Sequence, residues 1–201
     1  MPDFVNQAKT KKRLLLDAAL ALFVKQGIYA TSTASIAKAA GVANGTLFHH
    51  FSSKDILVLG LYKDIKQSFA LQIPAFELDA AQLKQQTKLI WQLAIEWTLN
   101  NAEQQKFCLL VMQYQPLSAQ SKAQVFDDEL AFLKKIVRFG QQHQIIADYP
   151  LALMLDNVHG QFLTSSQFFI NNTELAQNPQ YTEAAFNLFW GAITTTRRTF
   201  C

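Results

Sequence analysis

The sequence is poor in the residues that build disulfide frameworks, metal clusters and tight turns. Its 201 residues include two Cys, seven Gly and five Pro. The two cysteines, Cys108 and Cys201, lie far apart, which excludes a disulfide framework and a metal-binding spacing between them. Alternating strand patterns are also scarce, whereas half of the residues are hydrophobic. This composition predicts an all-α protein with a sizeable core and one or two domains.

The sequence also lacks a membrane-spanning run, a secretory signal and any recognisable catalytic motif. No uninterrupted apolar stretch is long enough to cross a bilayer, and the first residues contain no apolar signal core. We therefore expect a soluble, reduced, cytoplasmic protein with no membrane partner. Gly-rich phosphate loops, histidines paired four residues apart and nucleophile motifs are missing. The sequence thus predicts no enzyme, no metal and no other cofactor.

Charge is distributed unevenly along the chain. Residues 1–66 contain nine Lys and Arg against four acids, whereas residues 67–201 contain nine against eleven. A basic N-terminal part on a near-neutral remainder is typical of a phosphate-binding module on a larger carrier, although an ordinary solvated surface would give the same counts. Four of the cations cluster at the start of the first predicted helix, where a nearby anion would relieve their conflict with the helix dipole: Lys9, Lys11, Lys12 and Arg13.

Apolar spacing and helix-ending residues predict about nine helices, with boundaries accurate to a few residues. The first spans residues 9–26 and ends at Gly27, and the second is capped by Ser32 and ends at Gly41. The fourth is capped by Ser52 or Ser53 and reaches Leu71. The remaining helices are expected at residues 44–50, 79–100, 103–114, 118–143, 150–171 and 181–199.

Two short helices joined at Gly41 form the most informative part of the chain. In the second of them, Leu47 and Phe51 point inward one turn apart, which leaves the opposite face with small and polar side chains. A helix-turn-helix places such a helix in the major groove while the preceding helix braces the DNA backbone. Asn44 is suited to adenine, and the side chains suited to phosphates or base edges are Thr46, His49, His50, Lys54, Ser32 and Thr33. A purely structural helical corner is the alternative interpretation.

The same segment resembles the TetR/AcrR-like family of bacterial transcriptional regulators. The matching residues are Ile36-Ala37, Ala40-Gly41-Val42, Gly45-Thr46-Leu47-Phe48, His50-Phe51, Ser53-Lys54-Asp55 and Leu57, preceded by Ala18-Ala19, Leu22-Phe23, Gly27 and Thr31. The resemblance covers about the first 65 residues. It implies an all-α fold with a three-helix helix-turn-helix DNA-binding domain at residues 1–52 and a helical ligand-binding and dimerisation domain at residues 53–201.

Carried over position by position, the resemblance implies DNA contacts from Ser32, Thr33, Ala43, Asn44, Gly45, Thr46, Phe48, His49 and Lys54. Two positions depart from the family pattern. Phe48 stands where Tyr is usual, so a hydroxyl contact to phosphate is lost. Asn44 stands where Lys is frequent, so an electrostatic contact becomes a possible hydrogen bond. We expect weaker non-specific binding and an unchanged docking mode.

The last two long helices are apolar over wide arcs, with more surface to bury than one neighbour can cover. One seam of each can face the domain and the other a second copy, which predicts a homodimer built on a four-helix contact. Two deeply buried helices of a monomer are the alternative.

The middle helices are rich in large apolar residues, and in this family such helices enclose an inducer cavity. The resemblance therefore implies a small apolar or aromatic inducer, with candidate contacts from Trp97, Phe107, Val111 and Phe132 and polar anchors from Asn157 and Gln161. A plain core is the alternative for each of these residues. His159, on an apolar seam, is predicted to be a hydrogen-bonded core or interface histidine.

These observations predict a ligand-responsive DNA-binding transcriptional regulator. Its partners would be a palindromic double-stranded operator, a small-molecule inducer that releases it, and a second copy of the chain. The alternative is a helical small-molecule-binding or interaction module without DNA binding.

Overall fold

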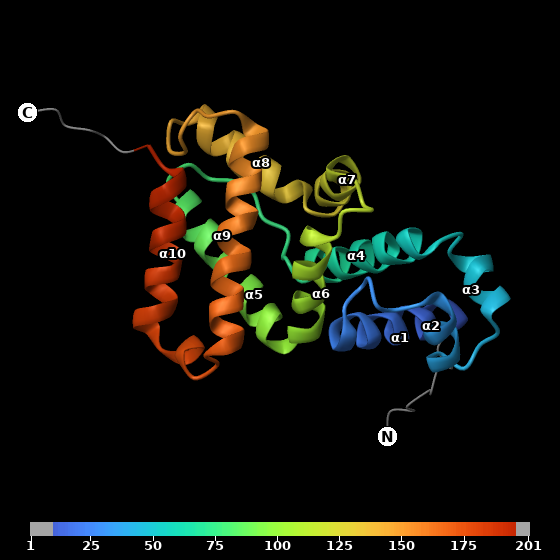
Figure 1. The fold of residues 1–201 in the computed structure, drawn as a ribbon. Helices are drawn as coiled ribbons and strands as arrows, with labels where there is room; N and C mark the ends of the chain where they lie inside the picture. The colour runs from blue at the N-terminus through green and yellow to red at the C-terminus, as the bar shows by residue number, and fades with distance from the viewer. Residues whose placement is uncertain (1–9, 196–201) are drawn as a thin grey trace, which may run out of the picture. The chain divides into compact units, whose positions relative to one another are not determined.

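The computed structural model describes residues 10–195, which form ten α-helices, one short 3₁₀ helix and a single isolated antiparallel bridge (Figure 1). This confirms the all-α prediction. Packing divides the described residues into two compact units. Unit 1 runs to Ile65 and includes Lys106–Lys122, whereas unit 2 consists of Lys66–Gln105 and the residues from Ala123 onward. The predicted domain boundary after residue 52 remains a prediction.

Unit 1 contains the predicted helix-turn-helix. Its elements are α1 (Lys11–Gln26), α2 (Thr33–Ala39), α3 (Asn44–His50), α4 (Lys54–Ala70) as far as Ile65, and α6 (Ala102–Gln113) from Lys106 onward. The hydroxyl of Thr10 accepts a hydrogen bond from the N–H of Arg13, which caps α1. At the other end of α1, Gly27 adopts a φ of 85°, which Gly tolerates without steric cost.

The turn between α2 and α3 follows directly from local chemistry. The Ser32 hydroxyl accepts the N–H of Ser35 at 3.1 Å, which confirms the predicted N-cap. Gly41 then adopts a φ of 68°, and the N–H of Val42 donates to the carbonyl of Ala37 at 3.0 Å. Because Gly carries no Cβ, the chain reverses within a few residues and α3 begins at the predicted position.

Unit 2 is built around an aromatic core. Its helices are α5 (Leu83–Asn100), α7 (Ala119–Glu129) from Ala123 onward, α8 (Ala131–Gln142), α9 (Leu151–Asn171), the 3₁₀ helix η1 (Leu175–Gln177) and α10 (Pro179–Ile193). Figure 1 shows α9 and α10 side by side, and α9 also packs against α5 and α8. Trp91 stacks on Phe189 with ring centroids 4.6 Å apart. The burial of such large rings supplies much of the hydrophobic driving force.

The prediction of one helix over residues 118–143 is wrong, because the chain bends at Leu130 between α7 and α8. Leu130 has φ −116° and ψ 32° and is buried. A straight helix of this length would extend about 39 Å. The bend instead lets Phe126 of α7 join Ile136 and Val137 of α8 in one core. No Gly or Pro marks this position, so the break follows from packing.

The last helix also ends earlier than residue 199, at Ile193. Thr194 has an extended conformation and pairs with Ile146 in the antiparallel bridge, while the N–H of Ala147 donates to the carbonyl of Ile193 at 2.9 Å. Residues 196–199 of the predicted helix lie outside the described residues. Among the described residues, no helix is both long and apolar enough to cross a membrane.

Candidate nucleic-acid interface

The α3 helix exposes one face and anchors the other. Leu47 is fully buried, and Phe51, which ends the helix, is 4 % exposed. The exposed or half-exposed residues of α3 and its N-cap are Ala43, Asn44, Gly45, Thr46, Phe48, His49 and His50. A Cβ added at Gly45 would meet no atom within 4 Å, so internal packing does not require Gly there. The outer face therefore combines a backbone that a partner can approach closely with a few polar groups.

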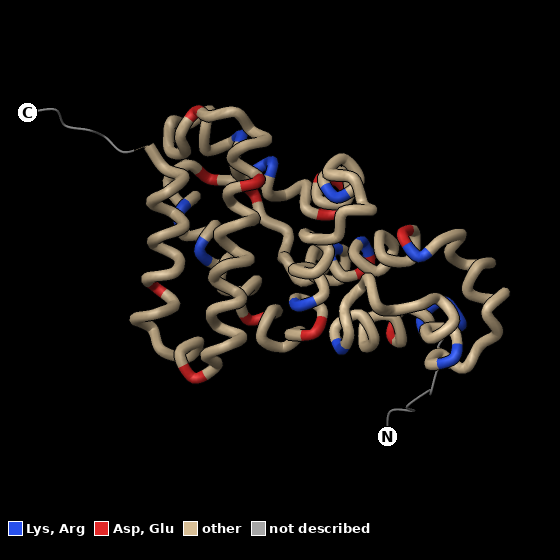
Figure 2. Tube along the Cα trace, in the orientation of Figure 1, with Lys and Arg blue, Asp and Glu red and all other residues tan. Residues whose placement is uncertain are grey.

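The same face carries two histidines but no Lys, Arg, Asp or Glu. Figure 2 shows Lys and Arg on the neighbouring helices and none on α3. Phe48 is 45 % exposed, an unusual position for a large apolar ring in water. The rings of His49 and His50 meet edge to face, with centroids 5.3 Å apart. The polar groups are therefore suited to hydrogen bonding more than to long-range attraction of phosphates.

Two cations counted from the sequence are engaged within unit 1. Arg13 donates to Asp17 at 2.8 Å and to Asp64 at 2.7 Å, so the anion anticipated near the first helix is supplied by the chain itself. Lys54 donates from Nζ to the carbonyls of Ile28, Tyr29 and Thr31 at 3.0, 3.4 and 3.2 Å. A phosphate would have to replace one of these carbonyls, because an ammonium has three donors. Lys9, another cation of the predicted cluster at the start of the first helix, lies outside the described residues.

At the start of α2, Ser32 is exposed and Thr33 is half-buried. The Ser32 hydroxyl already accepts the N–H of Ser35, and the Ser35 hydroxyl donates to the carbonyl of Ser32 at 2.7 Å. The Ser32 hydroxyl hydrogen remains able to donate outward, because a hydroxyl both donates and accepts. Ser32, Thr33 and α3 all belong to unit 1, in which α2 packs against α3, as expected for a helix-turn-helix.

Comparison with known proteins agrees with this geometry. The family described as bacterial regulatory proteins, tetR family, matches residues 15–61. A solved structure of a tetR family transcription regulator from Shewanella sp. PV-4 is 39 % identical, covers 94 % of this chain and 100 % of its own, and superposes with a TM-score of 0.88. The chain belongs to the TetR family.

Curated relatives match this TetR protein over less than half of its length. The transcriptional repressor KstR2 of Mycolicibacterium smegmatis is 36 % identical over 63 residues, which is 31 % of each chain. The match thus spans about a third of that relative. The structure of FadR from Bacillus subtilis, solved with stearoyl-CoA, covers 90 % of this chain at 18 % identity with a TM-score of 0.67, which shows a shared fold alone.

The residues predicted to bind a ligand do not form one group in this TetR protein. Phe107 and Val111 are fully buried in unit 1, where Phe107 stacks on Phe23 with centroids 5.7 Å apart. Trp97 and Phe132 are half-buried in unit 2, each in ring contact with Phe69. Core packing accounts for these three ring contacts and for the burial of Val111. Their role in ligand binding remains a prediction.

The two predicted polar anchors lie on the surface of unit 2. Asn157 and Gln161 line a groove of about 440 Å³ between α9 and α10, together with Gly160, Thr164 and Leu188 among others. The Asn157 amide donates to the carbonyl of Leu153 in its own helix at 3.0 Å. The role of these two residues in ligand binding remains a prediction. Among the described residues, no cluster of His, Cys, Asp and Glu could hold a metal ion.

Sequence reasoning predicted a hydrogen bond for His159 but missed its partner and a second buried polar contact. In unit 2, Nζ of Lys66 lies 3.3 Å from Nε2 of His159, and both side chains are buried. Burial lowers the pKa of His159 well below its usual value, and the charge of Lys66 lowers it further. This confirms the prediction of a hydrogen-bonded core histidine. Gln105 donates to Ser166 at 2.7 Å nearby along α9. A polar residue on an apolar helical seam was the only signal of this arrangement.

Proposed function

We propose that this protein is a homodimeric transcriptional regulator that binds a palindromic DNA operator through α3 and is released by a small apolar or aromatic molecule. The observation that carries this proposal is the exposed polar face of α3, held in place by the buried side chains of Leu47 and Phe51. Membership of the TetR family supports DNA binding, and the curated repressors that match part of the chain support repression. Residues 1–52 would form the DNA-binding domain and the remainder the ligand-binding and dimerisation domain.

DNA contacts are proposed for the exposed face described above. Thr46 would reach a phosphate or a base edge, Asn44 an adenine, and Ser32 a phosphate. The close approach of the α3 backbone would depend on Gly45, since any side chain there would stand between helix and duplex. Phe48 would contact sugar or base carbon atoms, because it carries no polar atom.

The dimer is proposed to form through the outer faces of α9 and α10. Leu188 is 75 % exposed and Leu153 is 57 % exposed, while Phe168 and Tyr181 stack with each other and remain about 40 % exposed. Apolar side chains gathered on two adjacent helices indicate a surface that another protein covers. A two-fold pairing of these helices would bury them in a four-helix contact.

The inducer would bind within unit 2, whose core is rich in aromatic rings. Bacillus subtilis FadR, which has the same fold, was solved with stearoyl-CoA, and the curated fatty acid metabolism regulator of that organism is 27 % identical over 86 residues. These neighbours support an apolar ligand class for this chain, such as an acyl chain.

DNA binding is tested with the full-length protein and a random-sequence duplex by fluorescence anisotropy over a range of salt concentrations. Affinity should fall steeply with salt, because cations released from DNA phosphates drive association. Thr46→Ala should weaken binding roughly fivefold to tenfold, as expected for one lost polar contact, whereas Thr173→Ala, on an exposed loop of unit 2, should not change it. Salt-independent or absent binding by the unmodified protein would remove the proposed function.

Two gain-of-contact variants test the docking mode. Asn44→Lys should steepen the dependence of log affinity on log salt by about 0.9, because one more phosphate is neutralised. Phe48→Tyr should tighten binding to random duplex by adding one hydroxyl contact to a phosphate. A wild-type slope as steep as that of Asn44→Lys would count against placing Asn44 at the duplex.

A further inference from the structure

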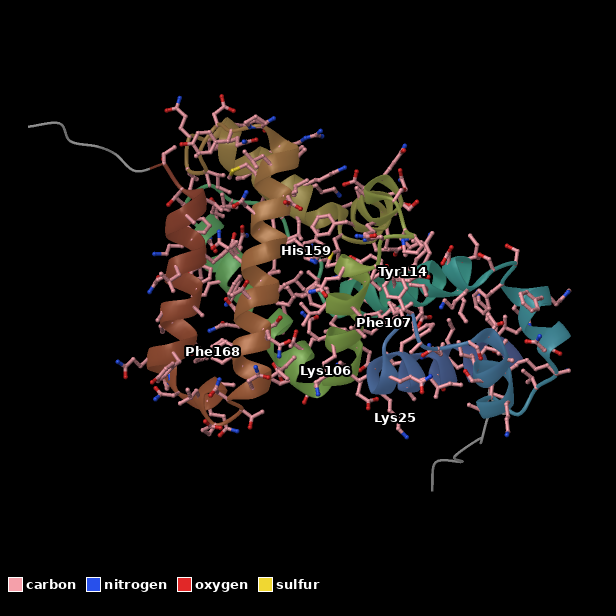
Figure 3. All side chains as sticks on the ribbon, in the orientation of Figure 1. Lys25, Lys106, Phe107, Tyr114, His159 and Phe168 are labelled. Carbon is pink, nitrogen blue, oxygen red and sulfur yellow. The ribbon has the colours of Figure 1, made fainter. Side chains whose placement is uncertain are left out.

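Two buried polar side chains form a hydrogen-bonded pair inside the largely apolar unit 2. Lys66 of α4 is 5 % exposed and His159 of α9 is 9 % exposed, and Nζ of the lysine lies 3.3 Å from Nε2 of the imidazole. Figure 3 labels His159 near the middle of α9. Burying an ammonium carries a large desolvation cost. A lysine retained in the core is therefore a candidate for a functional charge.

The positive charge of this pair resides on the lysine. An ammonium can only donate, so Nε2 of His159 accepts and the ring hydrogen is on Nδ1. Burial lowers the pKa of His159 well below its usual value, and the charge of Lys66 lowers it further, so the imidazole is neutral at physiological pH. The ring of Phe126 lies against that of His159, with centroids 4.9 Å apart. The pair thus provides a single positive charge away from bulk water.

A group of aromatic rings lies one helical turn from this charge. Phe69 follows Lys66 by three residues in α4, which places the two side chains on the same side of the helix. The ring of Phe69 contacts Trp97 of α5 and Phe132 of α8, with centroids 5.5 and 6.4 Å apart. These three residues, here called the aromatic wall, are half-buried in unit 2 and retain apolar surface that a bound molecule can cover.

We propose that the inducer of this protein is an organic acid, whose carboxylate binds Lys66 and whose apolar or aromatic body covers the aromatic wall. A carboxylate accepts a hydrogen bond from an ammonium more strongly than a neutral imidazole does, so it would replace His159 as the acceptor. Exclusion of water strengthens the attraction between the two charges. An alcohol of the same shape would bring no charge, and an amine would meet a like charge. This inference rests on the proposed function and names the chemical class of its inducer.

The test compares matched acids and alcohols on the full-length protein. The probes are decanoic acid with decanol, which share an alkyl chain, and cinnamic acid with cinnamyl alcohol, which share an aromatic body. Isothermal titration calorimetry at about pH 7.5, where both acids are ionised, measures their affinities. At least one acid should bind roughly tenfold or more tightly than its alcohol, as expected for a buried bond between two charged groups. At equal concentration that acid, and not its alcohol, should release the protein from a random-sequence duplex, as measured by fluorescence anisotropy.

Three variants, compared below their unfolding transitions, separate the charge of Lys66 from its structural role. Lys66→Gln keeps a donor for Nε2 of His159 and removes the charge, so the preference for acid over alcohol should fall to roughly threefold or less while the alcohol binds as before. Lys66→Arg keeps the charge and should retain most of the preference. Lys84→Gln, at an exposed lysine in the first turn of α5, is the matched control and should bind like the unmodified protein.

The comparison of acid with alcohol on the unmodified protein does not depend on the folding of any variant. Equal affinity for acid and alcohol in both pairs, no detectable binding of either acid, or an unchanged preference in Lys66→Gln would overturn this inference and leave DNA binding in place. Selective binding of an acid by a protein that does not bind duplex DNA would overturn the proposed function and leave the carboxylate site in place.

Discussion

Replacing Lys54 with Met would remove an ammonium that donates to three backbone carbonyls and would leave the aliphatic stem in place. The acceptors are the carbonyls of Ile28, Tyr29 and Thr31, in the loop that precedes α2. The bonds to Ile28 and Thr31 are 3.0 and 3.2 Å long and partly buried, whereas the bond to Tyr29 is longer and exposed. Two effective bonds from a charged donor, reduced for partial exposure to solvent, correspond to about 2–4 kcal/mol.

That loss should lower the thermal midpoint by roughly 4–16 °C in a chain of this size, since each kcal/mol shifts it by about 2–4 °C. Circular dichroism of the DNA-free protein measures it. Lys25→Met is the matched control, because Lys25 is exposed in the last turn of α1 and should cost at most about 1 kcal/mol through the helix dipole. The slope of log DNA affinity against log salt concentration should be measured on the same variants. Its magnitude should decrease by less than about 0.9, which is the change expected for one lost phosphate contact.

The two roles of Lys54 therefore give opposite results. A Lys54→Met variant with a wild-type midpoint and a slope reduced by about 0.9 would show that the ammonium leaves its carbonyls to bind phosphate. The structural argument would then be refuted. A lowered midpoint with a nearly unchanged slope would instead mean that Lys54 variants lose DNA binding because their fold is destabilised. A gel shift at a single salt concentration could not distinguish this destabilisation from the loss of a phosphate contact.

Three further predictions concern unit 2 and the dimer. Gly140→Ala should destabilise the protein by about 1–3 kcal/mol in urea unfolding, because the added Cβ would lie 2.5 Å from Cδ1 of buried Ile146. The same change should cost clearly less in an Ile146→Ala background, which keeps only the Cβ contact at 3.0 Å, and equal losses in both backgrounds would contradict the clash. Burial lowers the pKa of His159, so the unfolded chain binds a proton first as the pH falls. The free energy of unfolding of the wild type should therefore fall, relative to that of His159→Gln, by up to about 1.4 kcal/mol per pH unit below roughly pH 6.5. Parallel plots of unfolding free energy against pH for the two proteins would argue against this. Leu188→Glu should dissociate the dimer, as measured by sedimentation velocity, because Leu188 lies on the proposed interface. Leu71→Glu is the matched control and should leave the dimer intact, since Leu71 is 78 % exposed and Leu188 is 75 % exposed. A monomeric wild type would rule out the dimer.

The helix-turn-helix could be predicted almost completely because its determinants are close in sequence. Ser32 caps α2 through an N–H three residues away, and Gly41 supplies the positive φ of the turn. Leu47 and Phe51 then mark the buried side of α3, and the helix begins and ends where expected. Caps, turns and apolar periodicity act within one or two helical turns, so they can be read without knowing the remainder of the fold.

The break at Leu130 could not be predicted, because no residue there disfavours a helix. Helix propensity and apolar spacing continue through residues 118–143, whereas the core of unit 2 requires Phe126 and Ile136 to meet. Tertiary packing routinely overrides propensity in such segments. The early end of α10 has a similar origin, since Thr194 pairs with Ile146, which is distant in the sequence.

The candidate site also has some features that local sequence sets and others that tertiary packing sets. The amino-acid sequence alone determined the all-α class, the position of α3, its exposed polar residues and the family resemblance, because these depend on local pattern and residue type. Only the tertiary structure decided what the charged and aromatic groups touch: Arg13 pairs with Asp64 across 51 residues, and Tyr114 donates to Asp55 across 59. A charge count treats every cation as available to DNA, but pairing is set by which side chains the fold brings within about 3 Å of one another.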